Sequence, residues 1–169
     1  MDSNATIHCL LQSNYIDLKT IVLALSLLFS TGLSIFFYHK NRAFGFENTI
    51  NDRLFKIQDI AFHNPFLENK QFIDGWDDFA EEYRKNSKIN FEDETVKKYL
   101  QYEQYCEMIF NLISDTYSYT KNEEKMLNLV DYKEWVRVHK RWWQNPLEEH
   151  SNHDTYDKEL TKIIDEWIK

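Results

Sequence analysis

The amino-acid sequence predicts an all-α protein in which a single transmembrane helix is followed by a cytoplasmic bundle of about four to six amphipathic helices. Two observations predict this fold class. The first is one long, uncharged apolar run near the start of the sequence, and the second is the recurrence of apolar residues at steps of three and four through the rest of it. No segment alternates apolar and polar residues over a sustained length, so no β-sheet is expected.

The predicted transmembrane helix covers residues 20–38, a run of 19 residues without a charged side chain. At about 1.5 Å of rise per residue this helix is about 28 Å long, close to the thickness of about 30 Å of the hydrocarbon core of a bilayer. A cleavable signal peptide is the alternative, but it requires a basic leader, and residues 1–17 contain no Lys or Arg. The run is therefore expected to be an uncleaved anchor.

Basic residues near the two ends of this run predict its orientation, because Lys and Arg resist translocation. Lys19 is the only basic residue before the run. The nearest basic residues after it are Lys40, Arg42, Arg53 and Lys56. We therefore expect residues 1–19 to form a short extracytoplasmic N-terminus and residues 39–169 to form a cytoplasmic α-helical domain, in a single-pass protein of the bacterial inner membrane.

Composition excludes several classes of function. The sequence has 28 Asp and Glu against 20 Lys and Arg, a formal net charge of −8, which argues against a dedicated nucleic-acid binder. Its three glycines, Gly32, Gly45 and Gly75, lie too far apart for a glycine-rich phosphate loop, and neither GxGxxG nor GxxxxGK[ST] occurs. Nucleotide enzymes of the Rossmann or P-loop type are therefore excluded.

Two amphipathic segments are expected directly after the span. One begins near Phe46 and ends at Asn64-Pro65, because the residue before a proline is pushed out of the helical region. This helix either continues from the span or hinges at Gly45. A second stripe of apolar residues covers residues 72–83, and a polar run closes it. The paired carboxylates of this second segment are expected to form a solvated face; they are Asp77, Asp78, Glu81 and Glu82.

The longest helix is expected over residues 91–118, with Asn90 as its N-cap. Residues 121–144 are predicted to hold either one helix bent near Asp131 or two consecutive helices, and Asn145-Pro146 stops the pattern. The start of this region matches a capping box formed by Thr120 and Glu123. A last helix is expected over residues 154–168.

Three serines of the predicted span recur every four residues and therefore share one helix face; they are Ser26, Ser30 and Ser34. Small residues on one face let two helix backbones approach each other, and their hydroxyls can bond across the contact. This stripe predicts self-association or docking on another membrane helix. The alternative is that each hydroxyl bonds a carbonyl of its own helix four residues back.

Basic and aromatic residues alternate in one patch of this acidic sequence, composed of Trp135, Arg137, Lys140, Arg141, Trp142 and Trp143. Adjacent Trp142 and Trp143 point about 100° apart on a helix, so both are buried only if that helix is nearly central. If one of them is exposed, it is a natural anchor for a protein partner, since Trp and Arg dominate binding hot spots. The alternative is core packing.

Candidate metal ligands gather only near the last predicted helix, at His150, His153, Asp154 and Asp157. Neither HExxH nor the ExxH repeat of di-iron bundles occurs. We expect a solvated loop whose Asp154 and Asp157 cap the last helix, and a metal site is the alternative. Cys106 is flanked by Glu103 and Glu107, which would raise the pKa of its thiol, so it is expected to be a small buried hydrophobe. No catalytic residue, cofactor-binding residue or cofactor is predicted.

Three short segments occur in a characteristic order. They are HNPF at residues 63–66, YEQYCE at 102–107 and WVRVHKRWWQNP at 135–146, and a tyrosine-led final helix follows them. In this order they resemble a loose family of uncharacterised small bacterial proteins with one N-terminal membrane helix and a helical cytoplasmic domain. The resemblance implies the same architecture here, and it transfers no activity or site residue.

These observations predict a non-enzymatic, membrane-anchored helical interaction or accessory protein. It would dock a partner, or self-associate, at the membrane. The expected partners are the lipid bilayer and either another protein or a second copy of the chain, with no nucleic acid. The alternative function is a metal-dependent enzyme or defence-type effector that uses the region of His150 and His153.

Overall fold

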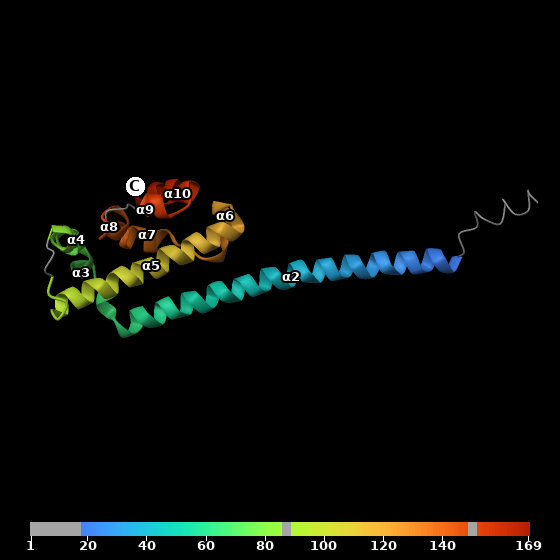
Figure 1. Ribbon diagram of the computed structural model, residues 1–169, viewed down its shortest axis with the longest axis horizontal. Coiled ribbons are helices and arrows are strands. Elements are labelled where there is room, and N and C mark those ends of the chain that lie inside the picture. Colours follow the sequence, from blue (N-terminus) through green and yellow to red (C-terminus); the bar gives the residue numbers. More distant parts are fainter. Residues whose placement is uncertain (1–17, 86–88, 149–151) are drawn as a thin grey trace, which may run out of the picture. The chain divides into compact units, whose positions relative to one another are not determined.

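The computed structural model describes residues 18–85, 89–148 and 152–169, and within these ranges it contains helices and no strand (Figure 1). The all-α class predicted from the sequence is therefore confirmed for the described residues. The chain divides into two compact units, Met1–Phe46 and Glu47–Lys169.

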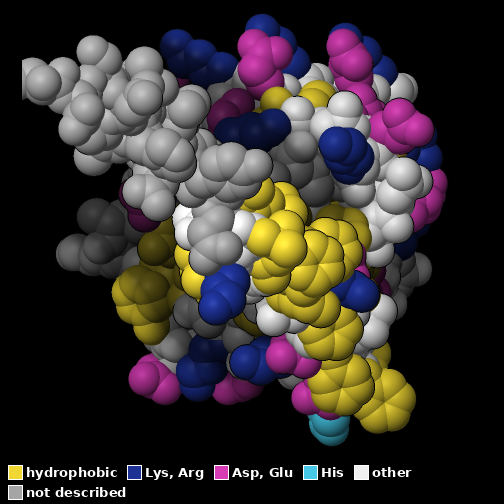
Figure 2. Space-filling view, turned by 90° about the vertical axis from the view of Figure 1, so that its right-hand side faces the viewer, with side chains coloured by type: hydrophobic (Ala, Val, Ile, Leu, Met, Phe, Trp, Pro, Cys, Tyr) yellow, Lys and Arg dark blue, Asp and Glu magenta, His cyan; other side chains and the backbone are white. Residues whose placement is uncertain are grey.

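Helix α2 (Leu18–His63) contains the whole predicted span. It is long and apolar enough to cross a membrane, and it is the one such helix in the described ranges. Figure 2 looks toward the N-terminal end of α2 and shows a group of hydrophobic side chains exposed on the face that is turned to the viewer. The helix continues through Gly45 without the hinge considered above, and its end at His63 confirms the stop predicted at Asn64-Pro65.

The second unit continues from α2 through short helices and one long one. These elements are η1 (Pro65–Glu68), α3 (Lys70–Asp74), α4 (Trp76–Lys85), α5 (Glu94–Thr120), α6 (Glu123–Leu129), α7 (Lys133–Val138), α8 (Lys140–Gln144), α9 (Asn152–Thr155) and α10 (Lys158–Ile168). Gly75 divides the segment expected over residues 72–83 into α3 and α4. A side chain at Gly75 would collide with the Tyr99 hydroxyl, which donates a hydrogen bond to the carbonyl oxygen of Phe72 at 3.1 Å.

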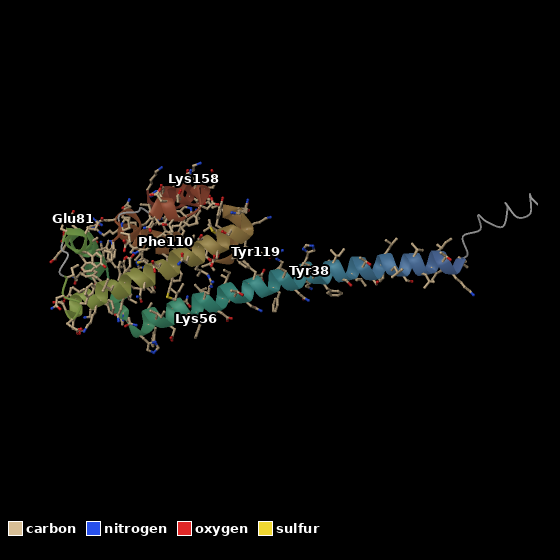
Figure 3. All side chains as sticks on the ribbon, in the orientation of Figure 1. Tyr38, Lys56, Glu81, Phe110, Tyr119 and Lys158 are labelled. Atoms are coloured by element: carbon tan, nitrogen blue, oxygen red, sulfur yellow. The ribbon has the colours of Figure 1, made fainter. Side chains whose placement is uncertain are left out.

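Helix α5 is the centre of this unit. Nine of its residues are buried, and the ring of Phe110 lies 4.9 Å from that of Trp142 and 5.0 Å from that of Trp143. Figure 3 shows Phe110 among the side chains packed between α5 and the C-terminal helices, whereas Glu81 and Lys158 lie at the outside. Burying aromatic side chains of this size is a dominant favourable contribution to folding. The C-terminal helices are therefore held mainly by aromatic packing on α5.

The cap of α5 differs from the prediction. Asp93, and not Asn90, is the N-cap, because its Oδ1 accepts hydrogen bonds from the backbone N–H groups of Thr95 at 2.7 Å and Val96 at 3.3 Å. The side chain of Asn90 instead accepts from the N–H of Glu92 and closes a turn before the helix. The predicted start at residue 91 is therefore three residues early.

Residues 121–144 contain three short helices, so the alternative of consecutive helices holds and adds one break. The predicted capping box is wrong, because Thr120 is the last residue of α5 and Asn122 caps α6 by accepting from the N–H of Lys125 at 2.9 Å. The break before α7 falls at the predicted Asp131, whose Oδ1 accepts from the N–H of Lys133 at 3.2 Å. His139 separates α7 from α8, and α8 ends before Asn145-Pro146 as predicted.

The last helix is also shorter than expected. Asp157 caps α10 by accepting from the N–H of Glu159 at 2.9 Å, which confirms its predicted role. Asp154 lies within the short helix α9, so its predicted role as a cap of the last helix is wrong.

Candidate functional site

A cleft of about 550 Å³ lies between the η1–α3 segment and helices α7 and α8. Its lining consists of Glu68, Lys70, Ile73, Asp74, Arg137, Val138, Lys140 and Arg141. Four of these eight residues are basic and two are acidic. We call this site the basic cleft, because basic residues outnumber acidic ones in its lining although the chain as a whole carries a formal net charge of −8.

Ion pairs neutralise part of the charge in the basic cleft. Arg141 pairs with Asp74 at 3.2 Å and also with Asp77, and Arg137 pairs with Glu134 at 2.5 Å. The contact with Arg141 corrects the prediction that Asp77 belongs to a solvated face, whereas Asp78, Glu81 and Glu82 are exposed as expected.

Lys70 and Lys140 differ from the two arginines. Both are exposed, and neither forms an ion pair with a described residue. Because they belong to α3 and α8, they come from the two opposite sides of the basic cleft. Lys70 and Lys140 are therefore the two cations of the basic cleft that no described carboxylate pairs with.

A hydrogen-bond network of buried side chains reaches the cleft at Glu68. The imidazole of His139 is completely buried, with Nδ1 3.0 Å from the hydroxyl of Tyr102 and Nε2 3.4 Å from Oε1 of Glu68. The hydroxyl of Tyr105 also donates to Oε1 of Glu68. A tautomer with a proton on Nε2 lets Nε2–H donate to Oε1 of Glu68 while Nδ1 accepts from the hydroxyl of Tyr102.

Glu68 connects this network to the basic cleft. Burial raises the pKa of its carboxyl group, but the hydrogen bonds from His139 and Tyr105 outweigh burial, so the pKa lies below its ordinary value. Both donors bind Oε1, and Oε2 has no hydrogen-bond partner among residues 18–85, 89–148 and 152–169. The side chain is 36% exposed and lines the cleft. Glu68 is therefore an ionised carboxylate with one oxygen available to a ligand.

The predicted basic-aromatic patch divides between the cleft and the core. Arg137 and Arg141 line the basic cleft, and Trp135 is half-buried. Trp142 and Trp143 are only 2% and 1% exposed. Neither is therefore the exposed tryptophan that would anchor a protein partner.

The two buried indoles also hold α8 in place through polar contacts. Nε1 of Trp142 donates to Oε2 of Glu103 at 2.5 Å, and Nε1 of Trp143 donates to Oδ1 of Asp165 at 3.0 Å. A buried indole N–H needs such a partner, because an unpaired one costs free energy. These tryptophans therefore position the helix that presents Lys140 and Arg141 to the cleft.

The three serines of the span bond within their own helix. Ser26 donates to the carbonyl oxygen of Val22 at 2.8 Å, and Ser34 donates to that of Ser30 at 2.9 Å, both four residues back. Ser30 donates to the carbonyl oxygen of Leu27 at 3.2 Å, three residues back. The hydroxyls therefore bond to carbonyl oxygens of their own helix, which was the alternative considered for them. Association of helices through this serine stripe stays a prediction.

The candidate metal ligands are engaged elsewhere or lie outside the described residues. His150 lies outside the residues that the structure describes. Nε2 of His153 lies 2.8 Å from Oδ2 of Asp165, and the carboxylate of Asp157 pairs with Lys121 at 3.3 Å. In the described part of the chain, no three His, Cys, Asp or Glu side chains come together in a way that could hold a metal ion.

A second cleft, of about 340 Å³, has the opposite charge. The carboxylates among its lining residues are Glu103, Glu107 and Glu148, and the aromatic side chains are Trp142 and Tyr156. Burial raises the pKa of Glu103 to about 7, with smaller contributions from Glu107 and Glu148. Cys106 is completely buried, as expected, and burial raises the pKa of its thiol.

Sequence reasoning missed Glu68, Lys70 and the buried position of His139. A signal for His139 exists, because Val136, His139 and Trp143 follow steps of three and four and therefore share the buried face. Nothing near Glu68 in the sequence indicates its role, since its partner His139 lies 71 residues away.

Comparison with known proteins finds no matching family model, no matching curated protein and no matching solved structure.

Proposed function

We propose that this chain is a membrane-anchored helical accessory protein, without enzymatic activity of its own, whose second unit docks a protein partner at the basic cleft. The observation that carries the proposal is the pair Lys70 and Lys140. Two exposed ammonium groups face one cleft, neither has an ion-pair partner in the described ranges, and the rest of the chain is acidic. An arrangement of this kind attracts carboxylates and favours a partner of complementary charge.

The composition of the cleft favours a protein over a lipid headgroup. The carboxylate of Glu68, which pairs with neither lysine of the cleft, would repel an anionic headgroup. A protein segment offers carboxylates for the lysines together with a hydrogen-bond donor for Glu68. Val138 is 40% exposed and supplies an apolar contact beside them. Arginines such as Arg137 and Arg141 are common at binding hot spots.

The anchor supports the same proposal. Helix α2 contains both the candidate span and the buried residues Ile50 and Ile57 of the second unit, so membrane and docking unit are joined by one helix. Restricting a docking unit to a membrane raises its effective concentration toward partners in that membrane. The basic residues Lys40 and Arg42 after the span favour a cytoplasmic second unit, in a bacterial inner membrane.

The test is photo-cross-linking of the full chain in native membranes, with a photoreactive residue in place of Val138. We expect one defined protein adduct that disappears in the charge-reversed variant Lys70→Glu/Lys140→Glu. The matched control is Lys125→Glu/Lys158→Glu, which reverses two exposed lysines that lie outside the cleft and form no ion pair with a described residue. Both variants change the net charge by the same amount.

Three results would contradict the proposal. The adduct could persist in the cleft variant, which would show that the lysines do not hold the partner. It could be lost equally in the control variant, which would assign the effect to net charge. Finally, cross-linking to lipid alone, dependent on Lys70 and Lys140, would identify the basic cleft as a membrane contact.

A further inference from the structure

We infer that the docked segment of the partner has both signs of charge: carboxylates that bind Lys70 and Lys140, and a Lys or Arg cation that binds the free oxygen of Glu68. This inference rests on the proposed function and names the chemistry of the partner. Glu68 is then the residue of the basic cleft that discriminates between a mixed-charge segment and a uniformly acidic one.

The geometry of Glu68 leaves one of its two carboxylate oxygens free of described partners. An ionised carboxylate has two acceptor oxygens with about four lone-pair sites. Both protein donors, Tyr105 and His139, bind Oε1. Oε2 is left without a partner among the described residues, on a side chain that lines the cleft. A ligand donor therefore finds an acceptor there that costs no internal hydrogen bond.

Buried side chains hold this carboxylate in one position. His139 is completely buried, and its other ring nitrogen is fixed by Tyr102 at 3.0 Å. Tyr105 is 1% exposed. Glu68 is therefore positioned by residues of the core, whereas an ordinary surface carboxylate must lose side-chain freedom when it binds. Such preorganisation strengthens binding because less ordering is required.

The charges around Glu68 also favour a ligand that carries a cation. Neither Lys70 nor Lys140 forms an ion pair with it, so its carboxylate is not neutralised by the cleft itself. A uniformly acidic segment bound to the lysines would bring like charge toward Glu68, which is unfavourable. A segment that includes one cation removes this repulsion and adds a charge-assisted hydrogen bond. The apolar stem of that cation has the exposed side chain of Val138 to pack against.

The test uses two fluorescent synthetic peptides and the purified full chain in a neutral detergent. Both peptides consist of glutamates and leucines around one central lysine, and in the second peptide this lysine is acetylated. Fluorescence anisotropy measures the two affinities. We expect wild-type protein to bind the lysine peptide about tenfold more tightly, because only the unmodified lysine forms a charge-assisted hydrogen bond with the carboxylate of Glu68.

The Glu68→Gln variant reverses the chemistry at one atom. Its side-chain carbonyl still accepts from Tyr105 and His139, while an NH₂ donor replaces the free oxygen. We expect the affinity for the lysine peptide to fall about tenfold and that for the acetylated peptide to stay the same, so the preference disappears. The comparison of the two peptides on wild-type protein remains decisive even if this variant does not fold.

Equal binding of the two peptides to wild-type protein would overturn the inference, as would a preference that survives in Glu68→Gln. A failure of the proposed function looks different. In that case the Lys70→Glu/Lys140→Glu variant would bind both peptides as wild type does. Binding to phosphatidylglycerol vesicles that displaces the lysine peptide and depends on the same two lysines would overturn both conclusions.

Discussion

Glu68 and Glu103 face two different clefts, and their carboxyl groups respond to the protein in opposite ways. Both are partly withdrawn from water, and both accept a hydrogen bond from an aromatic side chain, Tyr105 in one case and Trp142 in the other. Yet the pKa of Glu68 lies below its ordinary value, whereas burial raises the pKa of Glu103 to about 7.

Their neighbours explain the difference. Burial raises the pKa of both groups, so burial alone cannot separate them. Glu68 has a second hydrogen-bond donor, His139, and Glu103 has instead two carboxylates nearby, Glu107 and Glu148. The balance between burial, which is the largest single cause for both groups, and the hydrogen-bond donors and nearby charges therefore sets the direction of each pKa shift. A single small helical unit thereby holds one cleft in which basic side chains outnumber acidic ones and a second cleft whose charged side chains are carboxylates.

The largest expected effect comes from removing the donor that distinguishes Glu68. We expect His139→Ala to lower the free energy of unfolding by about 3 kcal/mol, because it opens a cavity and leaves Tyr102 and Glu68 without their partner. Urea denaturation of the full chain in detergent, followed by tryptophan fluorescence, measures the loss. The control His63→Ala changes an exposed histidine and should have an effect below about 0.5 kcal/mol. Equal losses in the two variants would contradict the role assigned to the buried network.

The next effect concerns Glu103 and depends on pH. Its pKa is raised from 4.5 to about 7 in the folded chain, so the folded state keeps a proton that the unfolded state releases, and stability falls as the pH rises from about 4.5 to about 7. Glu103→Gln removes this loss, and we expect it to increase the free energy of unfolding at pH 8 by about 2 kcal/mol. At pH 5 the gain should be much smaller. Urea denaturation at both pH values measures it, and a gain that is equal at the two would contradict the raised pKa.

The smallest effect is that of Glu68→Gln on stability, and its pH dependence has the opposite sign. A lowered pKa stabilises the fold above the unfolded value of 4.5, and this stabilisation is lost as the pH falls through the lowered pKa. We expect the variant to be less stable at pH 7 by about 1 kcal/mol, since the group is partly screened by solvent. The difference should shrink toward pH 3. Thermal unfolding across this pH range measures it, and a loss that grows at low pH would reverse the assignment.

Local patterns in the sequence predicted much of the fold. Prolines at Pro65 and Pro146 and the spacing of apolar residues act within a few positions, so the end of α2, the end of α8 and the long helix α5 followed directly. The errors fell where two local solutions compete. Asn90 and Asp93 are both good caps, and only the contacts of the folded chain select the second.

The site could be predicted far less well, because its halves are distant in the sequence. Arg137 and Arg141 were within reach as members of a basic-aromatic patch, although nothing local showed that they face a cleft. The opposite wall of that cleft lies in η1 and α3, and Arg141 reaches Asp77 across 64 residues. Periodicity and motif spacing describe neighbours along the chain, so such a pairing emerges only from the packing on α5.

The separation of the two walls also sets an order of events during synthesis. The wall that contains Glu68 and Lys70 leaves the ribosome first, then the whole of α5, and only afterwards the wall that contains Lys140 and Arg141. At about 5 to 20 residues per second, roughly 4 to 15 s pass between the emergence of Glu68 and that of Arg141. During this interval a nascent chain has only one side of the cleft. The proposed docking therefore requires a chain whose C-terminal helices have already emerged and folded onto α5.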